Sequence, residues 1–157
     1  MPYPLKHVVN SFLHRDFTGG KASITPMKMQ KLLYYLHGWH LAITDEPVIT
    51  EEFQAWPYGP VEESLYHYLK EYGGKPITDY LKEWRGEDHC ALMVAKKETT
   101  YQKIFDMVYR KYAPFNALQL STMTHQTGTP WDITRRKKQN IIDNMLIKNH
   151  FKEIIHD

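Results

Sequence analysis

Apolar residues recur at spacings of three and four along most of the chain, which is the pattern of amphipathic helices. This periodicity predicts helices over residues 5–13, 26–43, 60–72, 99–112 and 117–125, and a last helix that begins after Asp143. The stretch "QTGTPW" between the last two of these is predicted to be a loop. We expect the apolar positions of each helix to be buried, out to Ile43, Tyr68 and Ile155 near the helix ends.

The second helix has the clearest start signal and the least polar surface. Thr25 stands at the N-cap position and Pro26 at the first helical position, where each residue type is favoured. Tyr34, Tyr35 and His37 lie off its main apolar stripe, so the helix is apolar or aromatic nearly all round. A helix of this kind needs neighbours on several sides, and we therefore predict that it is central.

The stretch "FQAWPYGPVEESLY" changes the pattern. The β-forming residues Val48, Ile49, Phe53 and Trp56 predict a short strand near 50–56. "HCALMVAK" is a candidate second strand that could pair with this first strand. Trp56 precedes a proline and so favours extended geometry, while Gly59 permits a positive φ. Pro60 fits the first turn of a helix. We predict a stiff strand-to-helix corner here.

Together these elements predict a mainly α fold: a compact single helical domain with a small β element, α+β at most. The chain has 157 residues, enough for one domain with its own core, so we assign residues 1–157 to a single domain. The contents of 42% hydrophobic and 24% charged residues are ordinary for a globular protein.

The cellular environment is indicated by what the sequence lacks. Cys90 is the single cysteine, which excludes an internal disulfide and fits a reducing compartment. No apolar run approaches the ~20 residues that span a bilayer, and the first residues have no signal-peptide pattern. We expect a cytoplasmic protein without membrane contact.

Charge gives little support for nucleic-acid binding. The formal net charge is +2, and the excess lies in the "RRKK" run from Arg135 to Lys138, since residues 1–130 carry 14 basic and 14 acidic side chains. No aromatic residues interleave with the run. We interpret it as a solvated loop or helix approach, with transcriptional regulation as a minor alternative.

Candidate catalytic and metal-binding residues do not form a known pattern. Ser121 and His125 fall on one helical face with Asp132 nearby, but no nucleophile elbow accompanies them. His37 and His40 could share a helix face, yet no third ligand has a familiar spacing. We expect no catalysis, no metal and no cofactor, and keep a hydrolase based on Ser121 and His125 as an alternative.

The aromatic residues have two interpretations. They could build one aromatic core. Alternatively, the corner and the "THQTGTPW" loop meet, so that Tyr58, His125 and Trp131 line an exposed groove with Trp56 supporting it from beneath. Aromatic anchors of this kind dominate the binding energy of interfaces. We therefore expect these four residues to form a partner-binding face.

Three motifs resemble those of the Panacea domain family, also called SocA-like or GepA-like phage-associated proteins. They are "KMQKLLYYLHGWHLA", "FQAWPYGPVEESLY" and "STMTHQTGTPW". The matching positions are Lys31 to Tyr35, Ala55 to Val61, Thr124 to Trp131 and Asn149 to Phe151, within a similar region of about 23–155. Met29 replaces the usual leucine, and "NHF" stands where the family has a tyrosine-phenylalanine ending.

The resemblance implies an antitoxin of a bacterial or prophage toxin–antitoxin pair that neutralises a cognate protein toxin by direct binding. Within the matching motifs we expect Gly59, Pro60, Thr124 and Pro130 to have structural roles. An adaptor that presents its toxin to a protease is the alternative within binding proteins, and a homo-oligomer stays open. The chain offers no room for an added helix-turn-helix module.

Overall fold

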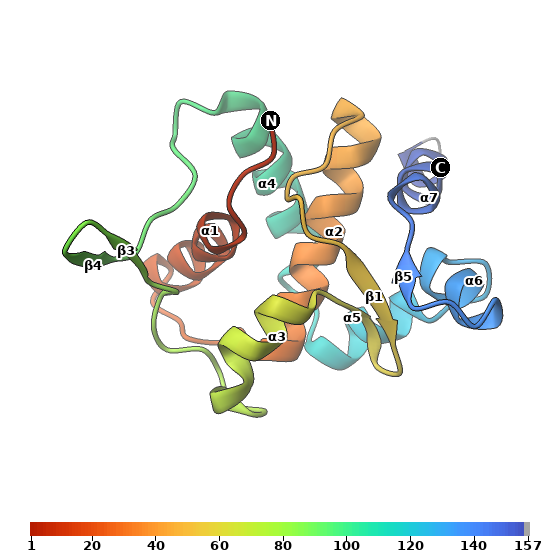
Figure 1. Cartoon of the computed structure of the whole chain (residues 1–157), viewed down its shortest axis with the longest axis horizontal. Coiled ribbons are helices and arrows are strands. Elements are labelled where there is room, and N and C mark those ends of the chain that lie inside the picture. The colour runs from red at the N-terminus through yellow and green to blue at the C-terminus, as the bar shows by residue number, and fades with distance from the viewer. Residues whose placement is uncertain (156–157) are drawn as a thin grey trace.

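Helix α2 (Pro26–Thr44) runs through the middle of the molecule, and the other helices pack around it (Figure 1). The computed structural model describes residues 1–155. The Thr25 hydroxyl accepts a hydrogen bond of 3.2 Å from the main-chain N of Lys28, and Pro26 takes the first helical position, as predicted. Residues 29–42 are all buried, which confirms that this helix is central.

The remaining elements of residues 1–155 are six α-helices, one 3-10 helix and five short strands. The helices are α1 (Leu5–Thr18), α3 (Glu63–Leu69), η1 (Lys70–Tyr72), α4 (Thr99–Tyr112), α5 (Ala117–Thr124), α6 (Pro130–Arg136) and α7 (Asn144–Ile155). The strands are β1 (Phe53–Trp56), β2 (Gly59–Val61), β3 (Glu83–Arg85), β4 (Asp88–Cys90) and β5 (Ile141–Ile142). This confirms the mainly helical fold with a small β element.

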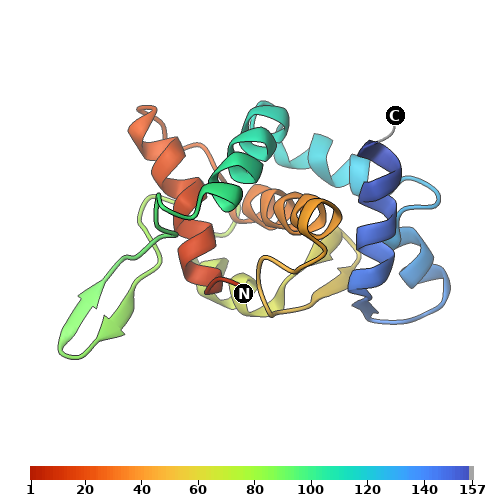
Figure 2. The same ribbon diagram turned by 90° about the horizontal axis from the view of Figure 1, so that it is seen from above.

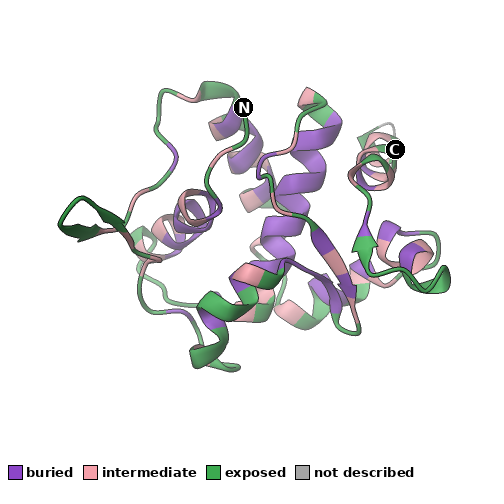
Figure 3. Cartoon of the chain, viewed as in Figure 1, coloured by how far each residue is buried: buried purple, intermediate pink, exposed green. Residues whose placement is uncertain are grey.

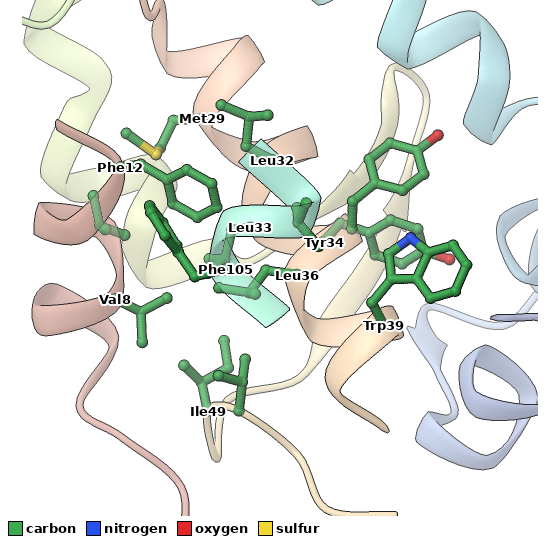
Figure 4. Packing of buried hydrophobic residues seen from close by; sticks show 14 of the residues in the cluster. Val8, Phe12, Met29, Leu32, Leu33, Tyr34, Leu36, Trp39, Ile49 and Phe105 are labelled. Atoms are coloured by element: carbon green, nitrogen blue, oxygen red, sulfur yellow. The ribbon is translucent and has the colours of Figure 1, made fainter. Parts of the chain in front are cut away.

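The main core lies where α2 meets α1 and α4 (Figure 4). The rings of Phe12 and Phe105 lie 4.8 Å apart and cover the apolar side chains of α2. Further along the same helix, Trp39 Nε1 donates a hydrogen bond of 2.9 Å to the Tyr112 hydroxyl. Its polar group is thus satisfied inside the core, as burial of an indole requires.

Helix α7 packs on the other side of α2 from α1 (Figure 2). Gly38 makes this approach possible, because a Cβ at that position would lie only 2.2 Å from the ring of Phe151. Phe151 also meets Tyr34, Tyr35 and Trp39 through ring contacts of 5.5–6.0 Å between centroids. The close seating of Phe151 against Gly38 is therefore one of the contacts that fix the last helix.

The predicted strand-to-helix corner is wrong, because the segment after Trp56 is a β-hairpin. β1 pairs with β2 in antiparallel register, with Ala55 opposite Pro60 and Trp56 opposite Gly59. On its other edge β1 pairs with β5, so the sheet order is β2-β1-β5. The main-chain N of Ala55 donates to Asn140 O at 2.7 Å, away from β2. The residue opposite Ala55 therefore does not need to donate a main-chain hydrogen bond to β1. Pro60, which has no main-chain N–H, is tolerated at this position of the strand.

Helix α3 begins at Glu63 rather than at Pro60. Glu62 is its N-cap, and its carboxylate accepts hydrogen bonds from the main-chain N atoms of Ser64 and Leu65. Strand pairing holds Gly59–Val61 extended, so the helix can start only after the strand ends. Leu65 and Leu69 are buried as predicted.

The second strand candidate, "HCALMVAK", is mostly not a strand: only His89 and Cys90 lie in β4, and they do not pair with the first strand. β4 pairs with β3 in a separate two-stranded hairpin that projects from the body of the molecule (Figures 1 and 2). Besides β2, β1 pairs with β5, a two-residue strand that follows α6. A strand this short carries almost no periodic signal, which explains why the pattern did not identify it.

Burial follows the predicted faces except near the helix ends (Figure 3). Ile43, Tyr68 and Ile155 are 44–48% exposed and lie outside the core, contrary to prediction. Helix α6 also begins inside the predicted "QTGTPW" loop, since Pro130 is its first residue and Thr129 its N-cap. Within residues 1–155, no helix has both the length and the apolarity to cross a bilayer.

Candidate partner-binding surface

The tip of the β1–β2 hairpin is fixed by side chains of helices α5 and α6. Trp131 Nε1 donates a hydrogen bond of 2.7 Å to the main-chain oxygen of Trp56. Ser121 Oγ donates one of 2.8 Å to the main-chain oxygen of Tyr58. Two acceptors of the turn are thus occupied by groups 63 and 75 residues away along the chain. The turn and the "THQTGTPW" segment lie together, as the sequence predicts.

Tyr58 is the most exposed aromatic residue of this region. Its exposed fraction is 67%, although its own main-chain oxygen is held by Ser121. Trp56 is only half-buried: its ring lies 5.0 Å from that of Tyr66 on α3, and its Nε1 donates to the side chain of Gln54. Trp56 therefore belongs to the surface itself and does not lie entirely beneath it.

His125 and Trp131 form a pair beside the turn. Their rings lie 4.0 Å apart. The guanidinium group of Arg135 lies over the Trp131 ring, 5.6 Å from its centroid. The Nε2 atom of His125 is buried and has no hydrogen-bond partner among residues 1–155. Burial lowers the pKa of His125, and the positive charges of Lys31 and Arg135 lower it further.

The described aromatic contacts do not join all four predicted residues. His125 touches Trp131, and Trp131 reaches the main chain of Trp56. No ring contact connects Tyr58 with His125 or Trp131 within residues 1–155. The predicted face is therefore a hairpin tip that carries Tyr58, with an aromatic pair next to its base.

The residues expected to have structural roles lie where the β1–β2 hairpin meets α2, α5 and α6. Gly59 has φ of 114°, and a Cβ there would lie 2.9 Å from both Lys31 Cε and Thr124 Oγ1. The Thr124 hydroxyl donates a hydrogen bond of 2.6 Å to Ser121 O. Pro130 is buried as the first residue of α6. Close approach of α2, α5 and the hairpin therefore requires a glycine at position 59.

Lys31 is the functional candidate that sequence reasoning missed. Its side chain is almost fully buried at 1% exposure, and its Nζ donates a hydrogen bond of 3.1 Å to Pro60 O. Burial lowers the pKa of this ammonium to about 8. The available signal was a lysine within a helix that is apolar all round, because such a helix offers no solvated face for the charge.

An apolar groove of about 210 Å³ lies on the side of the hairpin that faces α3. It is lined by Pro26, Met27, Gln30, Lys31, Trp56, Tyr58, Val61, Leu65, Tyr66, Leu69 and Gly73. The start of α2, the hairpin and α3 thus contribute one wall each. Trp56 and Tyr58 belong to this groove, while His125 and Trp131 lie outside it.

The residues of the hydrolase alternative have other partners. Ser121 donates to Tyr58 O, and the carboxylate of Asp132 accepts hydrogen bonds from Gly128 N and Arg136 Nε. No hydrogen bond joins Ser121, His125 and Asp132 to one another within the described part of the chain. This arrangement lacks the nucleophile–base contact on which acyl transfer depends.

The two candidate metal ligands on α2 also have separate partners. His37 Nε2 lies 2.8 Å from Asn144 Oδ1, and His40 Nδ1 lies 2.7 Å from Glu46 O. Over residues 1–155, no three His, Cys, Asp or Glu side chains are grouped in a way that could hold a metal ion. Both imidazoles have structural roles around α2.

Comparison with known proteins places these motifs in one family. The family described as antitoxin SocA-like, Panacea domain, matches residues 29–132, more than half of the chain. The chain is also similar to the protein named Antitoxin SocA from Caulobacter vibrioides (strain NA1000 / CB15N), with 29% identity over 112 residues. That similarity covers 70% of this chain and 59% of the relative's length. No solved structure matches the chain.

Proposed function

Because the chain belongs to the family of antitoxin SocA-like proteins with a Panacea domain, we propose that it neutralises a cognate protein toxin by binding it directly. The hairpin tip with Tyr58 is the centre of the proposed binding face, and His125, Trp131 and Trp56 complete it. On this basis residues 1–157 belong to one Panacea-like domain, which acts without catalysis of its own.

One observation carries the assignment of the face: a turn held rigidly from within exposes a large aromatic side chain. The main-chain oxygens of Trp56 and Tyr58 are both hydrogen-bonded to the α5–α6 region, while the Tyr58 ring is 67% exposed. A side chain presented on a rigid turn loses little conformational entropy on binding. Tyrosine is also among the residues that most often dominate interface energies.

The experiment uses the toxin encoded by a small reading frame next to the gene for this chain, identified by its toxicity when expressed alone. Tyr58→Ala should leave thermal melting near wild type, because the exposed ring makes few core contacts. The free energy of toxin binding should become less favourable by about 1 to 4 kcal/mol, the range for an interface anchor. Growth rescue in cells that express the toxin should weaken in parallel.

Trp84→Ala is the matched control. Trp84 is 69% exposed, as much as Tyr58, but it lies on the projecting β3–β4 hairpin, away from the proposed face. This variant should bind and rescue like wild type. If Tyr58→Ala binds and rescues normally as well, the hairpin has an architectural role only and the proposed face is wrong.

The route of neutralisation is tested with purified proteins. Direct inhibition predicts that the antitoxin blocks the toxin's activity in the absence of any protease. If inhibition appears only when an ATP-dependent protease is added and the toxin disappears, the chain is a proteolytic adaptor instead.

A further inference from the structure

The groove between α2, the β1–β2 hairpin and α3 is lined mainly by apolar side chains but also contains a positively charged residue. Among residues 1–155, Lys31 is the one charged residue that lines it, and no aspartate or glutamate does. The other walls are made by side chains such as Val61, Leu65 and Tyr66. An apolar groove with a single cation complements a ligand that is apolar and carries one negative charge.

Lys31 is only partly satisfied by its surroundings. An ammonium group has three donors, and Pro60 O is the acceptor that Nζ contacts. Lys31 forms no ion pair with a carboxylate of residues 1–155. A buried charge without a counter-ion is costly, so a carboxylate held in the groove close to Lys31 offsets part of that cost.

The start of α2 adds a second positive feature at the lip of the groove. Pro26 and Met27 are the first two residues of this 19-residue helix and both line the groove. The first turn of α2 contains no acidic residue. The positive end of the helix dipole therefore remains uncompensated by a side chain of that turn, which again favours a negative group.

We propose that this groove binds a short segment of the toxin in which an apolar side chain stands next to a carboxylate. The apolar side chain fills the space between Val61, Leu65 and Tyr66, and the carboxylate lies toward Lys31 and the start of α2. This inference rests on the proposed function, because it specifies the part of the partner that the hairpin side of the molecule recognises.

The size of the groove supports a side chain as its occupant. Its volume of about 210 Å³ is below the ~300–1,000 Å³ of pockets that enclose drug-sized ligands or cofactors. Three lip residues, Met27, Tyr58 and Tyr66, are 40–67% exposed, so a partner surface can cover the groove without rearrangement of the core. Hydrophobic anchors inserted into such pockets are typical of protein interfaces.

The test uses three fluorescein-labelled peptides of the form Gly-Ser-Leu-Phe-X-Gly-Ser, in which X is Asp, Asn or Lys, titrated with the full chain. We expect the Asp peptide to bind about tenfold more tightly than the Lys peptide, with the Asn peptide between them. High salt should reduce this preference. Equal affinities for all three peptides would overturn the proposal.

Two substitutions at one exposed position separate charge from shape. Met27→Glu and Met27→Lys both replace an apolar side chain at the lip by a long polar one. Met27→Glu should weaken binding of the Asp peptide about tenfold, while Met27→Lys should preserve it or strengthen it. Leu118→Glu, at a 74% exposed position of α5 outside the groove, is the control and should change nothing.

Lys31→Met removes the cation and keeps the length of the side chain. The preference for Asp over Asn and Lys should disappear in this variant. If Lys31→Met does not fold, the Met27 pair still decides the question, because Met27 is a surface residue. An undiminished Asp preference in folded Lys31→Met, or equal effects of Met27→Glu and Met27→Lys, would contradict the assignment.

The same variants distinguish this inference from the proposed function. If Met27→Glu still neutralises the toxin while Tyr58→Ala does not, the chain is an antitoxin and the groove is not its recognition site. If the peptides show the predicted order but wild-type protein does not bind the toxin, the groove is a binding site and the proposed function is wrong.

Discussion

Trp131 and Trp56 are joined by a hydrogen bond of 2.7 Å, in which the indole Nε1 of the first donates to the main-chain oxygen of the second. The bond connects the start of α6 with the end of β1, 75 residues earlier in the chain. It is one of the contacts that hold the hairpin in place while leaving its tip exposed.

The first prediction follows from this bond. Trp131→Phe keeps an aromatic ring but removes the donor, so the Trp56 oxygen loses its partner. We expect the free energy of unfolding to fall by about 1 to 2 kcal/mol, measured by urea denaturation. Ser121→Ala removes the second bond to the turn and should have a similar effect. Wild-type stability in both variants would show that the turn does not depend on these bonds.

Substitution of Gly59 should damage folding more than binding. A side chain at φ of 114° is strained, and its Cβ would lie 2.9 Å from atoms of Lys31 and Thr124. Together these effects should cost about 2 to 4 kcal/mol in Gly59→Ala and more in Gly59→Val, measured by thermal and urea unfolding. Gly74→Ala is the control, since a Cβ there meets no atom of residues 1–155 within 4 Å. Unchanged melting of Gly59→Ala would contradict the expected strain.

The buried ammonium of Lys31 should make stability rise with pH in the alkaline range. Its pKa is about 8 in the folded chain and 10.5 ordinarily, so between these values the unfolded state binds more protons. Stability therefore increases with pH through this window, by about 2 kcal/mol between pH 8 and pH 10. Urea denaturation across this range checks it, and Lys31→Met should remove the rise. A flat profile in wild type would contradict the assigned cause.

His37 should make the fold sensitive to acid. Burial lowers its pKa to about 4 from 6.5, so its neutral form is favoured in the folded state. Between these values the unfolded state takes up a proton that the folded state does not, and stability falls as pH falls from about 6.5 to 4. The loss attributable to this residue is about 3 kcal/mol.

The measurement for His37 is the pH dependence of unfolding in wild type and in His37→Gln, which cannot titrate. The slope between pH 6.5 and 4 should be smaller in the variant. An identical slope in His37→Gln would assign the acid sensitivity to other groups.

In the basic run, Arg135 should contribute to stability through its hydrogen bond to the hairpin. The other three side chains are exposed and donate no hydrogen bond to the hairpin within residues 1–155, so they should contribute little. Arg135 Nη1 donates a hydrogen bond of 3.0 Å to Ala55 O and lies over Trp131, so Arg135→Gln should lower stability by about 1 kcal/mol. Replacement of Arg136, Lys137 and Lys138 together by glutamine should change stability by less than about 0.5 kcal/mol, since exposed charges contribute little. Toxin neutralisation by the triple variant should be normal. Its loss in a folded protein would place these residues on the binding face.

Local signals predicted the elements whose determinants lie within one or two turns of helix. The Thr25 cap and Pro26 defined the start of α2, and Asn116 caps α5 through reciprocal hydrogen bonds with Gln119, as a short-range motif should. The apolar faces of α1 and α4 followed from periodicity alone. These features depend on residues three or four positions apart, which is the range that sequence patterns report.

The β1–β2 hairpin could not be predicted from local sequence signals. "WPYGP" indicated a turn, but its prolines and glycine were equally suited to a strand followed by a helix. Pairing of β1 with β5 and the bond from Trp131 decided in favour of a hairpin, and both partners lie 75 or more residues away. A short strand is stable only in the presence of its neighbours, so its own residues could not specify it.

The sequence by itself determined the helical class, the central position of α2, the glycine at the turn and the aromatic residues on either side of it. The tertiary structure decided that Lys31 is buried beneath the hairpin, that Trp131 supports Trp56, and that Tyr58 borders an apolar groove. These are relationships among α2, α3, β1, β2 and α6. They arise when separate elements pack together. Packing brings side chains into contact with partners that are distant in the sequence, and the exclusion of water shifts the pKa of a buried group.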